Sequence, residues 1–273
     1  MLYLSIMVLN KMDWDNIKKV AFLASQEGGK VLKNFLGKKL KVKHKGEIDI
    51  VTEADYLSEH AITKIIKEKF PDHQIYAEEK KDYTDMPSSF IWFIDPLDGT
   101  TNFAHGLPIF CISIALEVKG VMMMGLVYDP PREELFFALK GKGAYLNNKR
   151  IKVSETKKID KSLLVTGFPY DVRTSKENNL NYFQSFIMKA QAVRRLGSAA
   201  LDLCYVASGR FDGFWEMKLS PWDVAAGSLI VKEAGGEVTN FSGKKFNIHG
   251  REILADNGLI HKKMIEVLVN TKK

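Results

Sequence analysis

Cysteine is scarce in this chain of 273 residues, and no apolar run is long enough to cross a bilayer. The two cysteines, Cys111 and Cys204, lie 93 positions apart in apolar stretches. This excludes a disulfide framework and favours buried small side chains over metal ligands or nucleophiles. The apolar segment 1–9 lacks a basic leader and a small-residue cleavage site, so it is not interpreted as a signal peptide. We therefore expect a cytoplasmic protein without membrane contact.

Arginine is also scarce, since 33 of the 40 basic residues are lysine and 7 are arginine. Arginine is the side chain that best reads bases and grips phosphate groups in a fork. The basic residues are spread along the chain, and their one concentration, residues 38–45, is not interleaved with aromatic residues. The net charge of +7 therefore indicates a lysine-rich solvated surface, and a nucleic-acid partner is not expected.

Low-complexity segments, linkers and internal repeats are absent from the sequence, and its 45% apolar and 27% charged residues are typical of a globular protein. Hydrophobic periodicity predicts strands that alternate irregularly with helices, which favours a layered α/β fold. Helices are predicted over residues 15–36, 55–70, 175–190, 198–207 and 221–234. Strands are predicted over residues 47–52, 74–77, 90–94 and 162–166, with an antiparallel meander over 108–138.

The most informative segment is residues 95–103 (DPLDGTTNF), at the end of a buried strand. Asp95 and Asp98 are hard oxygen ligands without a nearby His or Cys, and this suits Mg²⁺ or Mn²⁺ and not zinc. The Gly-Thr-Thr that follows can offer backbone N–H groups and hydroxyls to an anion. The alternative is an ordinary Asx turn followed by a Ser/Thr cap.

Three further acids stand at predicted element ends. Asp55 and Asp223 open helices and could be simple caps, and Glu78 ends a strand and could be a surface charge. Together with Asp95 and Asp98, these carboxylates could hold two or more divalent ions against a phosphate ester.

The 95–103 motif, with residues 222–227 (WDVAAG) and 77–79 (AEE), resembles the inositol monophosphatase family. Residues 167–170 (GFPY) and 194–203 (RRLGSAALDL) resemble its bacterial inositol-1-monophosphatase branch. The resemblance runs from about residue 12 to the end of the chain. It implies the αβαβα five-layered sandwich of the sugar phosphatases, with residues 12–273 as a single catalytic unit of two interlocked lobes and residues 1–11 as an N-terminal extension.

The resemblance also assigns roles to individual residues. It implies that Glu78, Asp95 and the Leu97 carbonyl hold one Mg²⁺ ion, that Asp95, Asp98 and Asp223 hold a second, and that a third, weaker ion lies near Glu78. It implies that Thr100, with Asp55 behind it, helps to activate the attacking water, and it places Glu78 among the catalytic residues. The implied substrate contacts are Leu97, Asp98, Gly99, Thr100, Arg194, Gly197, Ser198, Ala199, Glu216 and Asp223. Within that set, backbone N–H groups of Gly99 and Thr100 cradle the phosphate. A second interpretation of Glu216 is a charge at the lip of the pocket, paired with Lys218.

The activity implied by the resemblance is hydrolysis of inositol-1-phosphate to inositol and phosphate by a Mg²⁺-dependent, Li⁺-sensitive homodimer, with Mn²⁺ as an alternative ion. One alternative is fructose-1,6-bisphosphatase activity, alone or alongside the first. A second alternative is a partner protein of the transcription antitermination machinery.

Overall fold

The computed structural model describes residues 12–38, 41–79 and 88–271; the predicted extension 1–11 lies outside them. The helices are α2 (Trp14–Phe35), α3 (Glu53–Lys69), α4 (Thr100–Ala104), α5 (Leu180–Ile187), α6 (Ala199–Ala207), α7 (Pro221–Glu233) and α8 (His261–Thr271), with a 3₁₀ turn η1 (Ile159–Lys161). The first strands are β1 (Val42–His44), β2 (Ile50–Thr52), β3 (Gln74–Ala77), β4 (Phe90–Asp98), β5 (Cys111–Val118), β6 (Val121–Asp129) and β7 (Glu134–Leu139). The later strands are β8 (Gly143–Leu146), β9 (Lys149–Ile151), β10 (Leu163–Thr166), β11 (Ala192–Arg194), β12 (Gly213–Met217), β13 (Glu237–Thr239) and β14 (Glu252–Asp256).

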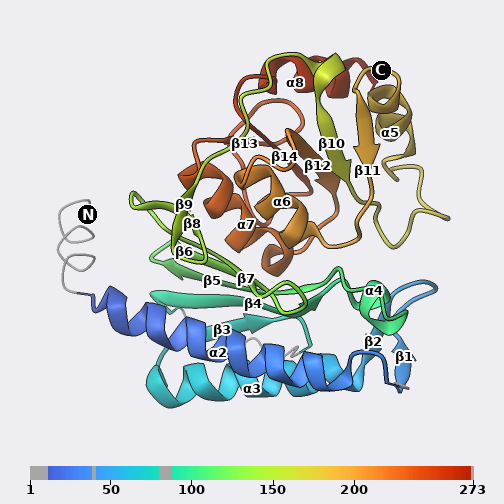
Figure 1. Cartoon of the computed structure of the whole chain (residues 1–273). Helices are drawn as coiled ribbons and strands as arrows, with labels where there is room; N and C mark the ends of the chain where they lie inside the picture. The colour runs from blue at the N-terminus through green and yellow to red at the C-terminus, as the bar shows by residue number, and fades with distance from the viewer. Residues whose placement is uncertain (1–11, 39–40, 80–87, 272–273) are drawn as a thin grey trace.

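These elements form five layers (Figure 1). Helices α2 and α3 cover one face of a seven-stranded sheet of order β3-β4-β5-β6-β7-β8-β9. Helices α6 and α7 separate it from a five-stranded sheet of order β11-β10-β12-β14-β13, and α5 and α8 cover the far face of that sheet. The predicted αβαβα sandwich is therefore confirmed.

The outer helix α2 is amphipathic and begins where Asp13 accepts a hydrogen bond from the Asn16 N–H at 3.0 Å. Its two glycines allow close packing on both sides. A Cβ on Gly28 would lie 2.8 Å from the Ile62 side chain of α3, and one on Gly29 would lie 2.5 Å from the ring of Tyr128 in β6. Both positions therefore need glycine for packing.

The central helices α6 and α7 are buried on nearly all sides because a sheet lies above and below them. A helix in that position must be apolar all round, which explains the weak amphipathicity of both segments. The contact with the seven-stranded sheet is close: a Cβ on Gly125 in β6 would lie 2.6 Å from the Ala226 carbonyl oxygen of α7. Helix α7 is thus packed directly against β6 of that sheet.

Two predicted elements are shorter than the periodicity suggested. The helix predicted over 175–190 begins at Leu180, because Asn179 has a φ of 72° and the Asn178 side chain accepts the Leu180 N–H at 3.2 Å. The strand predicted over 47–52 is limited to β2, which pairs with β1. Its last residue, Thr52, caps α3, which therefore starts at Glu53.

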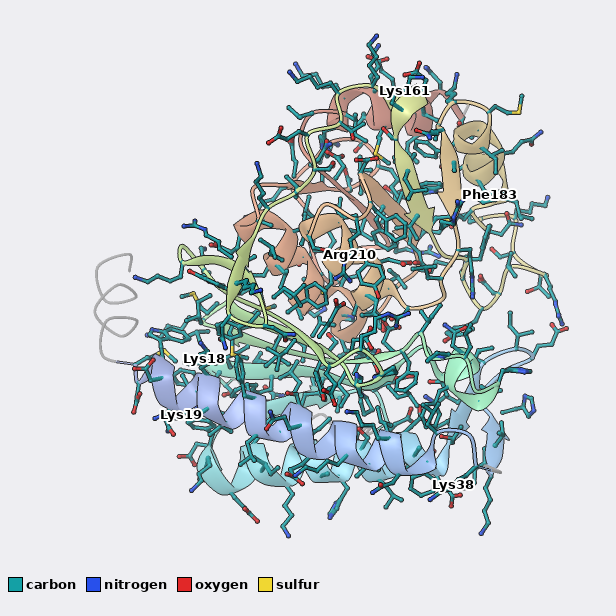
Figure 2. The ribbon with its side chains drawn as sticks, in the orientation of Figure 1. Lys18, Lys19, Lys38, Lys161, Phe183 and Arg210 are labelled. Atoms are coloured by element: carbon teal, nitrogen blue, oxygen red, sulfur yellow. The ribbon has the colours of Figure 1, made fainter. Side chains whose placement is uncertain are left out.

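The surface agrees with the lysine-rich composition. Lys18 and Lys19 lie together near the start of α2, whereas Lys38 lies beyond its other end and Lys161 lies at the opposite side of the molecule (Figure 2). Lys18 covers the aromatic rings of Phe22 and Phe137 with its ammonium group about 5 Å from each centroid. Within the described residues, no helix combines the length and the apolar character that crossing a membrane would require.

Candidate active site

A cavity of about 310 Å³ lies where β3 and β4 end and where α4, α6 and α7 begin. Most of the residues predicted from the sequence line it: Glu78, Asp95, Leu97, Asp98, Gly99, Thr100, Gly197, Ser198, Ala199, Glu216 and Asp223. Six different elements or turns thus contribute polar or charged groups to the lining of this cavity.

Strands β3 and β4 bring the first acids together. They are parallel neighbours with Ala77 opposite Ile94, so Glu78 and Asp95 follow at the same edge of the sheet. Residues three apart in a regular strand point to opposite faces. The pairing of β4 with β5 shifts register between Asp95 and Asp98, and this irregularity lets both carboxyl groups line the cavity.

The first turn of α6 holds Asp98. Its Oδ2 accepts hydrogen bonds from the Ser198 hydroxyl and from the Ala200 N–H, both at 2.7 Å. The Cys111 sulfur lies 3.8 Å from the same oxygen. Cys111 and Cys204 are both fully buried free thiols, as expected from their apolar surroundings.

Asp223 lies in the first turn of α7 and closes a capping box, in which its Oδ2 accepts the Ser220 N–H at 2.7 Å. The helix start is fixed from two sides. The Ser113 hydroxyl of β5 donates to the Trp222 carbonyl at 3.0 Å, and the Trp222 ring lies 5.4 Å from that of Tyr76 in β3. These contacts aim the Asp223 carboxyl group at the ends of β3 and β4.

Asp55 lies directly behind Thr100. The Thr100 hydroxyl is 3.0 Å from Asp55 Oδ1 and 3.0 Å from the Leu97 carbonyl oxygen. The other oxygen, Oδ2, accepts the N–H and the hydroxyl of Thr52 at 2.8 and 2.6 Å. Burial raises the pKa of Asp55 to about 6, although the hydrogen bonds from Thr52 and Thr100 oppose the rise.

Lys45 is a cavity residue that the sequence analysis assigned to the solvated surface. Its ammonium group lies 2.9 Å from Glu78 Oε1 and 2.5 Å from Glu79 Oε1. Burial of Lys45 is outweighed by these two carboxylates, so its pKa is raised. Lys45 lies at the end of a basic run in the sequence, so its contacts with these acids could not be predicted. They form only because folding brings the end of β3 beside Lys45.

The remaining acids repel each other. Burial, followed by the charges of neighbouring acids, raises the pKa of Asp95 and of Asp223 well above the ordinary value, and burial raises that of Asp98 to about 6. Oxygen-only donors with surplus negative charge fit a hard divalent cation such as Mg²⁺. Among the described residues, no three His, Cys, Asp or Glu side chains already form a compact ligand set. Each acid is instead held by its own protein donors.

Glu216 extends from β12 into the cavity and is 7% exposed. A Cβ on Gly167 would collide with its carboxyl group, so this glycine makes room for it. The interpretation of Glu216 as a lip charge paired with Lys218 is wrong, because the Lys218 ammonium group bonds Asp171 and Ser175 at 2.6 and 2.9 Å. Burial and the charge of Asp98 raise the pKa of Glu216 to about 8.

The two adjacent arginines differ in position. Arg194 ends β11, is exposed, and donates to the Val193 carbonyl at 3.2 Å, whereas Arg195 lines the cavity. Arg195 is exposed as well, but it is the one of the two that lines the cavity. The structure therefore places Arg195, and not the predicted Arg194, in the wall of the cavity.

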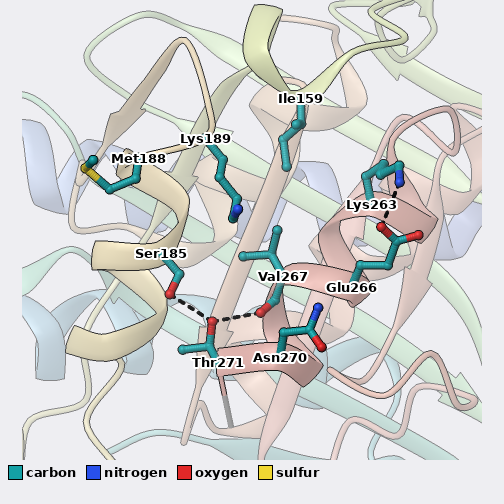
Figure 3. A pocket seen from close by; sticks show the side chains of 9 residues that line it. All are labelled: Ile159, Ser185, Met188, Lys189, Lys263, Glu266, Val267, Asn270 and Thr271. Atoms are coloured by element: carbon teal, nitrogen blue, oxygen red, sulfur yellow. Dashed lines mark hydrogen bonds and ion pairs between the residues drawn. The ribbon is translucent and has the colours of Figure 1, made fainter. Parts of the chain in front are cut away.

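A larger cavity of about 630 Å³ lies at the other end of the molecule, between α5 and α8 (Figure 3). Its acid, Glu266, is paired with Lys263 at 2.7 Å, and the Thr271 hydroxyl bonds Ser185 at 2.8 Å. None of the acids predicted to bind metal is among its lining residues. The chemistry of the molecule is therefore concentrated in the smaller cavity.

Comparison with known proteins agrees with this assignment. The sequence profile of the Inositol monophosphatase family matches residues 13–273. The inositol-1-monophosphatase of Synechocystis sp. PCC 6803 is 46% identical over 94% of this chain and 89% of its own length. The putative Nus factor SuhB of Neisseria meningitidis serogroup B is 41% identical over 91% of this chain and 96% of its own.

The same similarity holds in three dimensions. The structure of inositol monophosphatase from Anabaena (Nostoc) sp. PCC 7120 superposes with a TM-score of 0.87, at 43% identity, over 95% of this chain and 97% of that one. The profile, the relatives and the fold cover nearly all of the chain, and the protein therefore belongs to the inositol monophosphatase family.

Proposed function

We propose that this protein is a Mg²⁺-dependent phosphatase that hydrolyses inositol-1-phosphate to inositol and phosphate. The observation that carries the proposal is the convergence of Glu78, Asp95, Asp98 and Asp223 on one cavity beside the Asp55–Thr100 pair. The family supports a phosphatase, and the Synechocystis relative supports the inositol ester as substrate.

The ions would be held by oxygen atoms alone. Glu78, Asp95 and the Leu97 carbonyl would hold one Mg²⁺, and Asp95, Asp98 and Asp223 would hold a second. A third, weaker ion would lie near Glu78. Mn²⁺ is the alternative to Mg²⁺ at these sites. When bound, such ions neutralise the phosphate dianion and lower the pKa of a water molecule. Lys45 would then exchange its contact with Glu78 for solvent or substrate.

The chain's own groups complete the chemistry. The Thr100 hydroxyl can accept a proton from the attacking water while it passes its own to Asp55, whose pKa of about 6 suits brief proton storage near neutral pH. Backbone N–H groups of Gly99 and Thr100 would bind the phosphate. Gly99 has a φ of 100°, and a Cβ there would lie 2.9 Å from the Ile109 carbonyl oxygen, so a side chain is excluded.

The alcohol half of the substrate would lie on the opposite wall. Gly197, Ser198 and Ala199 at the start of α6 face it, and Glu216 would accept hydrogen bonds from its hydroxyl groups. The wall also contains Arg195.

The direct test measures phosphate release from inositol-1-phosphate and from fructose-1,6-bisphosphate side by side, with and without Mg²⁺. The proposal expects Mg²⁺-dependent turnover with a higher kcat/KM for inositol-1-phosphate. A higher kcat/KM for fructose-1,6-bisphosphate would establish the alternative activity, and no turnover of either ester would contradict a phosphatase function.

A second candidate function is supported by names among the relatives, since several bacterial proteins at 41–43% identity are called Nus factor SuhB. In this function the protein would join the transcription antitermination machinery through its surface. Co-elution of the purified protein with purified antitermination factors tests this role, and an Asp98→Asn variant should co-elute equally well.

The assembly and location are further parts of the proposal. We propose a cytoplasmic homodimer, with residues 12–273 as one catalytic unit of two interlocked lobes. Light scattering on a size-exclusion column measures the mass, and a mass near the monomer value of 30.9 kDa would contradict the dimer. We also propose that Li⁺ inhibits turnover, and the same phosphatase assay measures this inhibition.

A further inference from the structure

One buried carboxyl group of the active-site cavity has an oxygen without a partner. Asp202 of α6 is 1% exposed and lines the cavity. Its Oδ1 is the one fully buried side-chain oxygen or nitrogen, among the residues that the structure describes, without a hydrogen-bond partner. Folded proteins keep few such atoms, because leaving a buried acceptor unpaired forfeits its hydration. The atom therefore calls for a donor that the chain alone does not supply.

The position of Asp202 connects it to the substrate wall. Its backbone N–H donates to the Ser198 carbonyl at 3.0 Å, so it lies one turn beyond the segment that binds Asp98. The start of α6 thus presents Ser198 and Ala199 beside Asp98, and Asp202 lies one turn farther along the same wall of the cavity. Glu216 reaches this region from β12, and its charge acts on Asp202.

The charges around Asp202 disfavour an anionic ligand. The positive charge of Arg195 lowers the pKa values of Asp202 and Glu216. Burial and the charge of Glu216 raise the pKa of Asp202 well above the ordinary value. Two acids so placed cannot both ionise at low cost, and one neutral carboxyl beside one carboxylate can both donate to and accept from hydroxyl groups. An anionic group would be repelled.

We propose that Asp202 is a specificity-determining residue that hydrogen-bonds a hydroxyl group of the alcohol half of the substrate, beside the hydroxyl that Glu216 binds. The inference rests on the proposed phosphatase function and narrows its substrate class to phosphate esters of polyols with neighbouring hydroxyl groups. An aryl phosphate, which lacks these hydroxyls, gains nothing from Asp202.

The test compares inositol-1-phosphate with p-nitrophenyl phosphate as substrates of the full chain at one Mg²⁺ concentration. Asp202→Leu keeps the branched shape and the number of heavy atoms of the side chain, although it is larger, and removes both oxygens. It should lower kcat/KM for inositol-1-phosphate by about 10-fold or more, mostly through KM, and change that for p-nitrophenyl phosphate by less than about 2-fold. Asp202→Asn keeps one acceptor and should lose less on inositol-1-phosphate than Asp202→Leu does.

Cys204→Ala is the matched control, because Cys204 is fully buried two residues further along α6 but does not line the cavity. This variant should change kcat/KM for both substrates by the same factor. Thermal unfolding is recorded for all variants, and Asp202→Asn should melt at or above the wild-type temperature because it removes an unpaired carboxyl group.

The outcomes separate this inference from the proposed function. Equal losses on both esters in Asp202→Leu, or none on either, would overturn the role of Asp202 while leaving the phosphatase intact. If Asp202→Leu does not fold, the same comparison of kcat/KM for the two substrates is made with Asp202→Asn and decides the question. A melting temperature of Asp202→Asn several degrees below the wild type would show that the carboxyl group has a structural partner. Wild-type turnover of neither ester would contradict the proposed function and this inference with it.

Discussion

Two acids of the site are helix caps and cavity residues at once. Asp55 and Asp223 both occupy the third helical position of a capping box, where one carboxyl oxygen accepts the N–H of the cap residue. The cap interpretation of these residues is therefore correct and does not exclude a functional one. A cap fixes the side-chain torsions of an acid, and a fixed acid is a better ligand or proton acceptor than a mobile one.

At this scale, Asp98→Asn and Asp223→Asn should each lower kcat by about 10²-fold or more without unfolding the protein, because each removes a charge that the account assigns to metal binding. The hydrogen bonds to Ser198 and Ser220 can persist with an amide oxygen. The measurements are kcat and the melting temperature, with Asp72→Asn, an exposed acid, as the control. Near-normal turnover in either site variant would mean that these acids are caps alone.

Most of the residues predicted from the sequence line the cavity, but three other lining residues, Lys45, Arg195 and Asp202, were not predicted. The identified acids sit in motifs that are contiguous in the chain, so the pattern of residues is enough to notice them. Lys45 faces Glu78 only after β3 is placed beside it, and Asp202 looks like an ordinary helical acid until both sheets bury it. Their roles depend on tertiary neighbours, which periodicity does not encode.

At the scale of elements, α2, α3, α6, α7 and the strand at β4 could be predicted because long periodic or continuous apolar runs specify them. Short strands were harder. β12, β13 and β14 were not predicted, since runs of three to five residues resemble loops unless a neighbouring strand pairs with them. The meander was predicted as a whole, and β5, β6 and β7 fill it.

His261, the first residue of α8, should make the stability of the protein depend on pH. Burial lowers the pKa of His261, but the hydrogen bond and charge of Asp256, 2.6 Å from Nδ1, outweigh burial and raise it. A folded pKa above the unfolded one means that the protonated form is favoured in the native state. The contribution is fully present below about pH 6.5 and is lost as pH rises through the folded pKa.

Chemical unfolding between pH 5 and pH 9 measures this effect. The free energy of unfolding of the wild type should fall with pH relative to that of His261→Gln, which keeps a polar side chain near Asp256. Burial also raises the pKa of Asp256 itself, so both proteins must retain that residue. A constant difference across the range would contradict the linkage.

Because β6 and α7 are in close contact at Gly125, we expect even a methyl side chain at this position to destabilise the protein. Gly125→Ala would place a Cβ against the backbone of Ala226, which has no side-chain freedom to yield, so the free energy of unfolding should fall by roughly 1–3 kcal/mol. Gly46→Ala is the control, because its nearest heavy atom would be 3.6 Å away. Equal stability of the two variants would show that the layers can separate at no cost.

At the scale of the whole molecule, the family match begins at residue 13, where Asp13 caps α2. Deletion of residues 1–11 retains that cap and should shift the melting temperature by less than about 2 °C and leave kcat unchanged. Differential scanning calorimetry and the phosphatase assay check both. A drop of several degrees would show that residues 1–11 contribute to the stability of the protein.

The fold brings acidic side chains from distant parts of the sequence together in one cavity. Burial raises the pKa of Asp95 and of Asp223, and the charge of Asp98 raises both further, so that a bound divalent cation would relieve this repulsion. The central claim is therefore that activity depends on a divalent metal ion.

The most direct measurement of this claim is phosphate release from inositol-1-phosphate before and after treatment with excess EDTA, followed by return of Mg²⁺. Turnover should be lost in the chelator and should recover when Mg²⁺ exceeds it. Both cysteine thiols are buried with raised pKa values, so neither offers a thiolate nucleophile as a substitute. Full turnover in excess EDTA would contradict the account.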